Sequence, residues 1–204
     1  YTDPDGKAFD VIKYAILNSI TALRHARNQG YDLQRYLDGK YDQYQWFNNS
    51  IFNLYIYQKE MINNACVSNG WQPAFILGGS HADVKQNSLG GVAESHHMIS
   101  AWAITVTKTS MTIMNAPAIL MSRVDHMKTM SWGNKQSPDA LDYRAKQKAY
   151  LEEGNYLAAF DLEAGLIREL FGDKYDEQIQ AAREYLIGWI EQQKSKESEE
   201  GGGR

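Results

Sequence analysis

Two adjacent histidines, His96 and His97, stand in the segment GGVAESHHMIS at residues 90–100. If this segment is an extended strand, their side chains point to opposite faces, because side chains alternate along a strand. One imidazole can then bind a divalent metal ion while the other takes a proton from water, since the ordinary pKa of imidazole is close to neutrality. That chemistry suits hydrolysis of a phosphodiester, where a metal ion neutralises charge on the phosphate. Two neighbouring histidines are also often incidental.

A second group of polar side chains strengthens the first. The segment PAILMSRVDHMKTMSWGN at residues 117–134 places Asp125 and His126 at or near a predicted helix start. Metal sites often take ligands from a strand and from a following helix, since both are rigid. Asp125 could instead be a plain N-cap, and His81 in GGSHAD is a further possible ligand.

Composition limits the class of protein. The chain has 204 residues, of which 43% are hydrophobic and 23% charged, as in an ordinary globular protein. No apolar run approaches the roughly 18 residues of a membrane span, and the N-terminus lacks the pattern of a signal peptide. The single Cys66 excludes an internal disulfide and a cysteine-rich zinc site, and we expect it to be a small buried hydrophobe.

Charge is distributed unevenly. Residues 101–150 carry seven Lys/Arg and three Asp/Glu, which is +4, whereas residues 151–200 carry five and thirteen, which is −8. The basic segment could meet a polyanion, although a mixed solvated surface is the alternative.

Apolar periodicity predicts a mainly helical chain with a small β insert, which is an α+β fold. Helices are predicted over 7–28, 31–40, 42–68, 138–153, 155–171 and 174–193. Residues 71–122 read as short strands and loops, with AITVT at 103–107 and PAILM at 117–121 as the best strands.

The helices are expected to bury apolar stripes. The predicted buried residues are Phe9, Ile12, Ile16, Ile20 and Leu23 in the first helix, Tyr44, Phe47, Ile51, Tyr55 and Ile62 in the second long helix, and Ile179, Ala182, Leu186, Trp189 and Ile190 in the last. The predicted domains are a helical cap or adaptor over 1–70, a functional domain over 71–193 and a disordered tail over 194–204.

Residues of about 90–180 resemble a C-terminal domain of bacterial polymorphic toxins, including the YD-repeat or rearrangement-hotspot kind. The resemblance covers some 45% of the chain and depends on a set of markers taken together. These are the His pair, Pro117-Ala118-Ile119, Asp125-His126, Thr129, Ser131, Gly133, Tyr143-Arg144, Gln147, Leu151, Gly154, Ile167-Arg168, Phe171-Gly172 and Lys174-Tyr175-Asp176. Such domains are grouped with the HNH and endonuclease VII superfamily, named by the residue before the pair, here Ser95.

This resemblance implies a β-hairpin with a metal site, of the His-Me finger type, and a metal-dependent endonuclease that hydrolyses DNA or RNA. His96 would be a ligand of a divalent ion such as Mg²⁺ or Zn²⁺, and His97 the general base. His126 would be the downstream ligand, while Asp125 would ligate the ion or orient a histidine. Glu94 would be a further ligand or a hydrogen-bond acceptor for one.

The resemblance also implies partners. The start of the chain, YTDPDGK, is similar to junctions between a YD-repeat shell and its toxin, and it lacks an initiator Met. We therefore expect an antibacterial effector that is part of a larger delivery protein, secreted or injected, active in the cytoplasm of the target cell and neutralised by an immunity protein. Phosphates of the nucleic acid would meet Lys128, Arg144, Lys146 and Lys148, and Arg144 first, because a guanidinium suits phosphate.

Two other functions fit the same residues. A metal-independent ribonuclease could use two histidines as acid and base on the RNA 2′-hydroxyl, and it would work in the presence of a chelator. A non-enzymatic helical docking module would keep its activity after replacement of His96 and His97.

Overall fold

The computed structural model of the chain describes residues 7–133 and 135–201. The chain folds as two compact units, Tyr1–Ile76 and Leu77–Arg204. The predicted boundary between the helical region and the functional domain was after residue 70.

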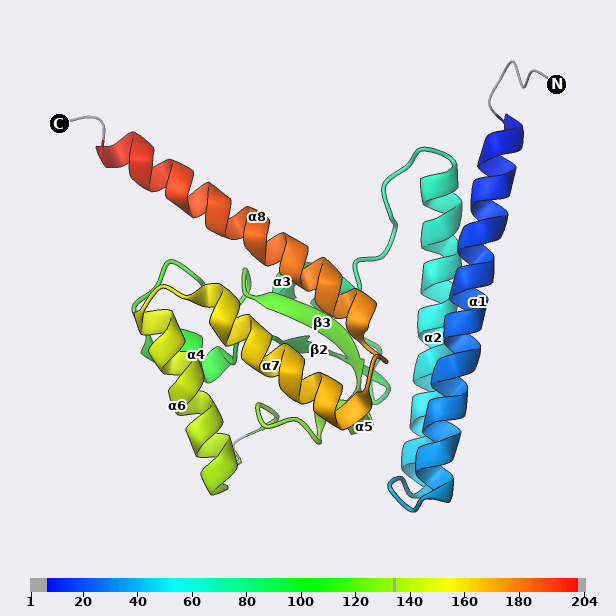
Figure 1. Ribbon diagram of the computed structural model, residues 1–204, viewed down its shortest axis with the longest axis horizontal. Helices are drawn as coiled ribbons and strands as arrows, with labels where there is room; N and C mark the ends of the chain where they lie inside the picture. The colour runs from blue at the N-terminus through cyan, green and yellow to red at the C-terminus, as the bar shows by residue number, and fades with distance from the viewer. Residues whose placement is uncertain (1–6, 134, 202–204) are drawn as a thin grey trace. The chain divides into compact units, whose positions relative to one another are not determined.

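The first unit is a pair of antiparallel helices, α1 (Lys7–Leu37) and α2 (Gln43–Ser68) (Figure 1). Asp42 begins α2 with a capping box: its carboxylate accepts from the Gln45 backbone N–H at 2.8 Å, and its own N–H donates to the Gln45 side chain. The prediction that the first helix ends near residue 28 is wrong, because α1 continues through Gly30 to Leu37. Most of the short helix predicted over 31–40 is therefore the last part of α1. A mid-helix glycine costs about 1 kcal/mol, which packing against α2 can offset.

The predicted buried faces of this unit are also wrong. Ile20, Leu23, Tyr44 and Phe47 are 49%, 72%, 64% and 58% exposed, while the side chains of Phe9 and Ile12 lie outside the described residues. The helices instead bury a largely polar stripe: Thr21, Asp32, Asn48, Asn49, Phe52, Asn53 and Ile56.

Hydrogen bonds between the two helices explain why this polar stripe is buried. Asn53 donates to Asp32 at 2.7 Å, and Asn64 donates to the Thr21 hydroxyl at 3.0 Å. Buried polar groups are tolerated when they find such partners. Apolar periodicity could not reveal these pairs, since it ranks asparagine as a surface residue.

The second unit is built on a three-stranded antiparallel sheet in the order β1-β3-β2. Its strands are β1 (Gly78–Ser80), β2 (Ala93–His97) and β3 (Pro117–Ser122), and His96 lies opposite Ile119 in the register. The predicted strand PAILM is confirmed as β3, all of whose residues are buried. The mainly helical α+β class is therefore confirmed.

One predicted strand is wrong. The segment AITVT falls largely in α4 (Ala101–Val106). Ser100 begins this helix, because its hydroxyl accepts from the Ala103 N–H and its own N–H donates to the Gln147 side chain at 2.8 Å. A cap of this kind, together with burial of Ala103 and Ile104, outweighs the β propensity of Thr and Val.

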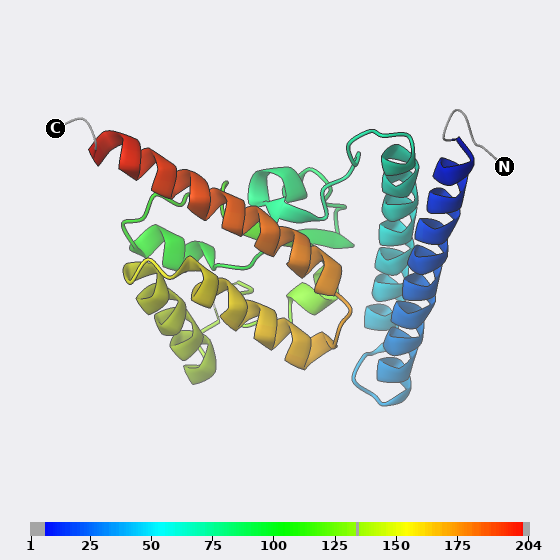
Figure 2. The same ribbon diagram turned by 45° about the horizontal axis from the view of Figure 1, so that its top comes forward.

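The remaining helices surround the sheet. They are α3 (His81–Lys85), α5 (Arg123–His126), α6 (Pro138–Glu152), α7 (Tyr156–Phe171) and α8 (Asp176–Gly201). Figure 2 shows α8 crossing in front of the strands, and α8 packs on β1 and β3. The approach is so close that a Cβ on Gly78 would stand 2.1 Å from the Gln178 carbonyl oxygen.

The core of this unit is apolar. Phe160 and Ile167, two of the apolar residues expected to face inward from the helix predicted over 155–171, are at most 2% exposed, as are Ile179 and Leu186 of α8. The predicted inner face of α8 is therefore confirmed at these positions. The predicted disordered tail is wrong for residues 194–201, which continue α8, while residues 202–204 lie outside the described residues. Lys, Glu and Gln are good helix formers, and here they extend a helix already held by its packed first half. Among the described residues, no helix is both long and apolar enough to span a bilayer.

Candidate functional site

The histidine pair ends strand β2, as predicted for an extended segment. Residue alternation places Glu94 and His96 on one side of the strand and Ser95 and His97 on the other. Each imidazole is held by a different partner.

His96 is held by a buried carboxylate from a distant helix. Its Nε2 donates to Oε1 of Glu163 in α7 at 2.7 Å, and both side chains are 1% exposed. Ser131 also approaches the same carboxylate oxygen, at 3.4 Å. Among the described residues, Nδ1 of His96 and Oε2 of Glu163 are buried without a hydrogen-bond partner. A polar atom left in this way is available to a ligand, a water or an ion.

Tyr143 of α6 is buried beside Glu163. Desolvation, and then the negative charge of Glu163, raises the pKa of the Tyr143 hydroxyl well above its ordinary value. The phenol therefore stays protonated and can donate a hydrogen bond but not act as a base.

His126 lies beside His96, with ring centroids 4.8 Å apart and nearly perpendicular planes. Its Nδ1 donates to Oε2 of Glu94 at 2.9 Å, and Arg123 donates to the other oxygen of the same carboxylate. Burial, followed by repulsion from His96, lowers the pKa of His126 to about 2. The ring is therefore a neutral imidazole whose Nε2 carries the lone pair.

His97 is held by the loop that precedes β3. Its Nε2 donates to the Ile113 carbonyl at 3.2 Å, which leaves the lone pair on Nδ1. His81 of α3 stacks on it with ring centroids 3.9 Å apart, and His81 Nδ1 shares a hydrogen bond with the Ser95 hydroxyl at 2.9 Å. Burial, and then the neighbouring His81, lowers the pKa of His97 to about 4.

Asp125 is not among the residues that line the site. It is fully buried, and its carboxylate accepts from Lys174 Nζ at 2.9 Å and from the Tyr175 hydroxyl at 2.8 Å. The alternative of a plain N-cap is also wrong, because Ser122 caps α5. This network joins α5, which carries His126, to the turn before α8, so Asp125 has a structural partner of opposite charge.

A cleft of about 300 Å³ connects these groups. His96, His97, His126 and Arg144 line it together with Trp102 and Trp132. The guanidinium of Arg144 is tied to the backbone, where it donates to the carbonyl oxygens of Ala140 and Lys135.

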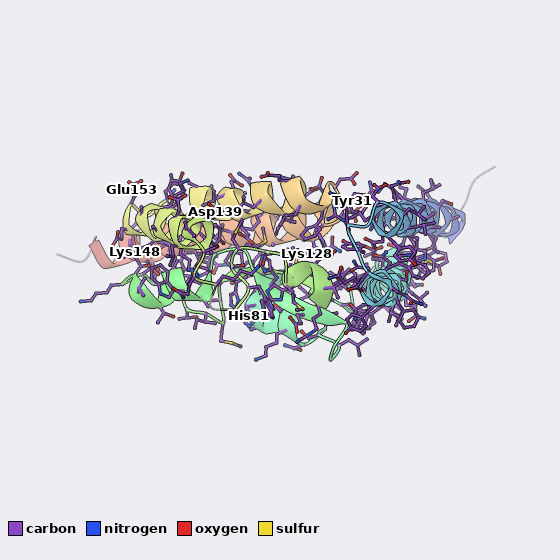
Figure 3. The ribbon with its side chains drawn as sticks, turned by 90° about the horizontal axis from the view of Figure 1, so that it is seen from below. Tyr31, His81, Lys128, Asp139, Lys148 and Glu153 are labelled. Atoms are coloured by element: carbon purple, nitrogen blue, oxygen red, sulfur yellow. The ribbon has the colours of Figure 1, made fainter. Side chains whose placement is uncertain are left out.

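The predicted phosphate-binding lysines are not gathered at this cleft. Lys146 pairs with Asp142 at 2.7 Å, and Lys148 pairs with Glu152, all four on α6. Figure 3 shows Lys128 well apart from Lys148. Of the four predicted basic residues, only Arg144 lines the cleft.

Glu163 and the two tryptophans of the cleft were not predicted as site residues. Glu163 stands between Phe160 and Ile167 on the buried face of α7, and an acid on such a stripe is itself a signal of a buried partner. The cleft tryptophans carry no such signal, because they come from separate segments that only folding unites.

The possible ligand atoms of the cleft can be compared with those of protein metal sites. No group of three or more His, Cys, Asp or Glu placed to hold a metal occurs in residues 7–133 and 135–201. Two imidazoles each keep one lone pair, His96 on Nδ1 and His126 on Nε2, and their ring centroids are 4.8 Å apart. Imidazole nitrogens suit Zn²⁺ and related transition-metal ions, whereas Mg²⁺ prefers carboxylate and water oxygens, so this donor set fits an ion of the Zn²⁺ kind better.

Fold and site together define a histidine-lined cleft on a small antiparallel sheet within a helical frame. Comparison of the chain with protein-family models, with curated proteins and with solved structures found no match.

Proposed function

We propose that residues 77–204 form a nuclease toxin domain that hydrolyses phosphodiester bonds of nucleic acid with the help of a divalent metal ion. The observation that carries the proposal is the way the imidazoles are held. His96, His97 and His126 each donate one ring N–H to a carboxylate or carbonyl oxygen. Each ring is thereby set in one tautomer, with one lone pair left for chemistry.

His97 is the general base in this proposal. Its N–H is anchored on the Ile113 carbonyl, and burial lowers its pKa to about 4, so the ring is neutral near pH 7 and Nδ1 can accept a proton from the attacking water. Stacking against His81 restricts rotation of the ring.

His96 and His126 would hold the divalent ion, which would neutralise charge on the phosphate that is being cleaved. Glu163 and Glu94 orient these two rings, as carboxylates behind metal-binding histidines commonly do. Glu94 is thus assigned to orientation rather than to direct ligation, and Asp125 to the buried pair with Lys174. The chain order β2, β3 and α5 supports this proposal, because a His-Me finger is expected to have antiparallel strands followed by a helix.

The biological setting remains that implied by the resemblance to polymorphic toxins. In this setting the domain is delivered as part of a larger secreted or injected protein, degrades DNA or RNA in the cytoplasm of a competing bacterium, and is neutralised by an immunity protein in the producing cell.

The first test is a metal titration of the purified chain. Wild type treated with a chelator should lose cleavage of plasmid and of RNA and regain it when Mg²⁺, Mn²⁺ or Zn²⁺ is added. His96→Ala and His126→Ala should each weaken metal binding, while His25→Ala, a histidine in the other unit, should not. Equal metal affinity in all four proteins would reject the metal site.

The main alternative is a metal-independent ribonuclease that uses the same histidines, and it is favoured by the small number of protein ligands in the described residues. Full cleavage of RNA, but not of DNA, in excess chelator would establish it. Expression in bacteria without an immunity protein, followed by inspection of genomic DNA and total RNA, would separate both nucleases from a docking module, which would degrade neither.

A further inference from the structure

Two tryptophans form part of the cleft that holds the histidines. Trp102 is the second residue of α4 and is 44% exposed, and Trp132 lies in the segment between α5 and α6. By contrast, Trp189 of the same unit is 7% exposed in the core. The cleft tryptophans therefore present aromatic surface that packing inside the unit does not use.

Both tryptophans line the same cleft as His96, and each lies within two residues of a serine with a defined partner. Trp102 follows Ser100, which is fixed at the start of α4 by the Gln147 side chain at 2.8 Å. Trp132 follows Ser131, whose hydroxyl lies 3.4 Å from Glu163 Oε1. The two serine contacts position the backbone that carries each indole, and a backbone held in this way favours a defined stacking site.

The size and charge of the cleft indicate what could stack there. Its volume of about 300 Å³ is at the small end of ligand pockets and suits one nucleotide. Proteins that grip a duplex usually present several Lys and Arg to its phosphates. Among the described residues that line this cleft, Arg144 is the only Lys or Arg.

We propose that the cleft binds an unpaired nucleotide, with Trp102 and Trp132 stacking on its base, and that the substrate is therefore single-stranded nucleic acid. A paired duplex keeps its base faces stacked on one another, whereas a single strand exposes them to aromatic side chains. This inference rests on the proposed nuclease function and specifies its substrate. The stacking surface is shared by DNA and RNA strands.

The test uses the full chain carrying His97→Ala, so that binding is measured without cleavage. Fluorescence anisotropy would follow a labelled DNA strand and an RNA strand of about 12 nucleotides, within the usual site size of single-strand binders, and the matching DNA duplex. Either single strand should bind at least about tenfold more tightly than the duplex, which corresponds to 1.4 kcal/mol. The strand that binds more tightly shows whether the cleft prefers a DNA or an RNA nucleotide.

Substitution of the indoles tests the stacking directly. Trp102→Ala and Trp132→Ala should each weaken single-strand binding by about 5- to 150-fold, from about 1–3 kcal/mol per stacked base. Trp102→Phe and Trp132→Phe should retain most of the affinity, which guards against a general loss of folding. Trp71→Ala is the matched control, because Trp71 is 69% exposed in the other unit.

Two failures can be told apart. Equal binding of duplex and single strands, or unchanged binding in both Ala variants, would overturn the stacking proposal and leave the nuclease function in place. If wild type neither binds nor cleaves any of the three nucleic acids, the proposed function itself is rejected, and the stacking proposal with it.

Discussion

The two units of this chain bury polar side chains in opposite ways. In the hairpin of α1 and α2, the buried polar groups pair across the helix interface, as Asn53 does with Asp32 at 2.7 Å, while Leu23 and Tyr44 stay exposed. In the second unit an apolar core surrounds a few buried polar pairs that join segments distant in sequence. His96 and Glu163 are 67 positions apart, and Asp125 and Lys174 are 49 apart.

This difference separates polar pairs that serve packing from polar pairs that hold a site. Polar pairs along a helix interface fix how two neighbouring helices pack. Buried ion pairs add little to the free energy of unfolding, because desolvation offsets their attraction. A buried pair that joins distant segments is therefore better explained by the elements that it positions. In the second unit, both pairs hold elements that carry histidines of the cleft.

The largest effect is expected at His97. His97→Ala should reduce cleavage by about 10²- to 10⁴-fold, the usual contribution of a general base, with no loss of folding. The measurement is plasmid and RNA cleavage beside a thermal melt, with His25→Ala as the control. A well-folded His97→Ala protein that still cleaves at the wild-type rate would show that His97 is not the general base.

The next effect concerns the buried pair behind α5. Lys174→Met should destabilise the second unit by about 3–5 kcal/mol, because it leaves the Asp125 carboxylate buried without its ion-pair partner. Hydrogen exchange resolved along the sequence would measure this loss separately from the hairpin. The double variant Asp125→Leu with Lys174→Met should recover part of the stability, whereas equal loss in both variants would show that the uncompensated charge is not the cause.

A smaller effect is expected in the hairpin. Asp32→Ala removes the acceptor of the buried Asn53 amide and should cost about 1–3 kcal/mol. The same hydrogen-exchange experiment should place this loss in residues 7–68 and leave protection of the sheet in the second unit unchanged. Protection lost equally in both units would mean that they unfold together.

The smallest effect is expected from removal of the hairpin. All the cleft residues belong to the second unit, so a shortened chain that starts at Leu77 should retain cleavage within a few-fold, by comparison of initial rates with the full chain. A soluble, folded Leu77–Arg204 protein without activity would show that the hairpin shapes the site.

Much of the fold follows from local patterns. The helices α6, α7 and α8, the cap at Asp42 and the strand β3 could be predicted because their signals lie within a few residues of one another. A strand over the His pair was compatible with the predicted short strands and loops of 71–122, but its bounds, Ala93–His97, were not predicted. The hairpin interface and α4 were not predicted either, since hydrogen bonds to partners 21 and 47 positions away decided them.

Local sequence patterns predicted short strands and loops over 71–122 and a helix start at or near Asp125 and His126, because strand and helix propensities act over a few residues. The occupied imidazole nitrogens depend on tertiary structure, since Glu163, Glu94 and the Ile113 carbonyl reach the rings from other parts of the chain. The tertiary structure likewise placed Asp125 in an ion pair and gathered Trp102, Trp132 and Arg144 around one cleft. Contacts of this kind depend on how whole elements pack, and no short window of sequence contains both partners.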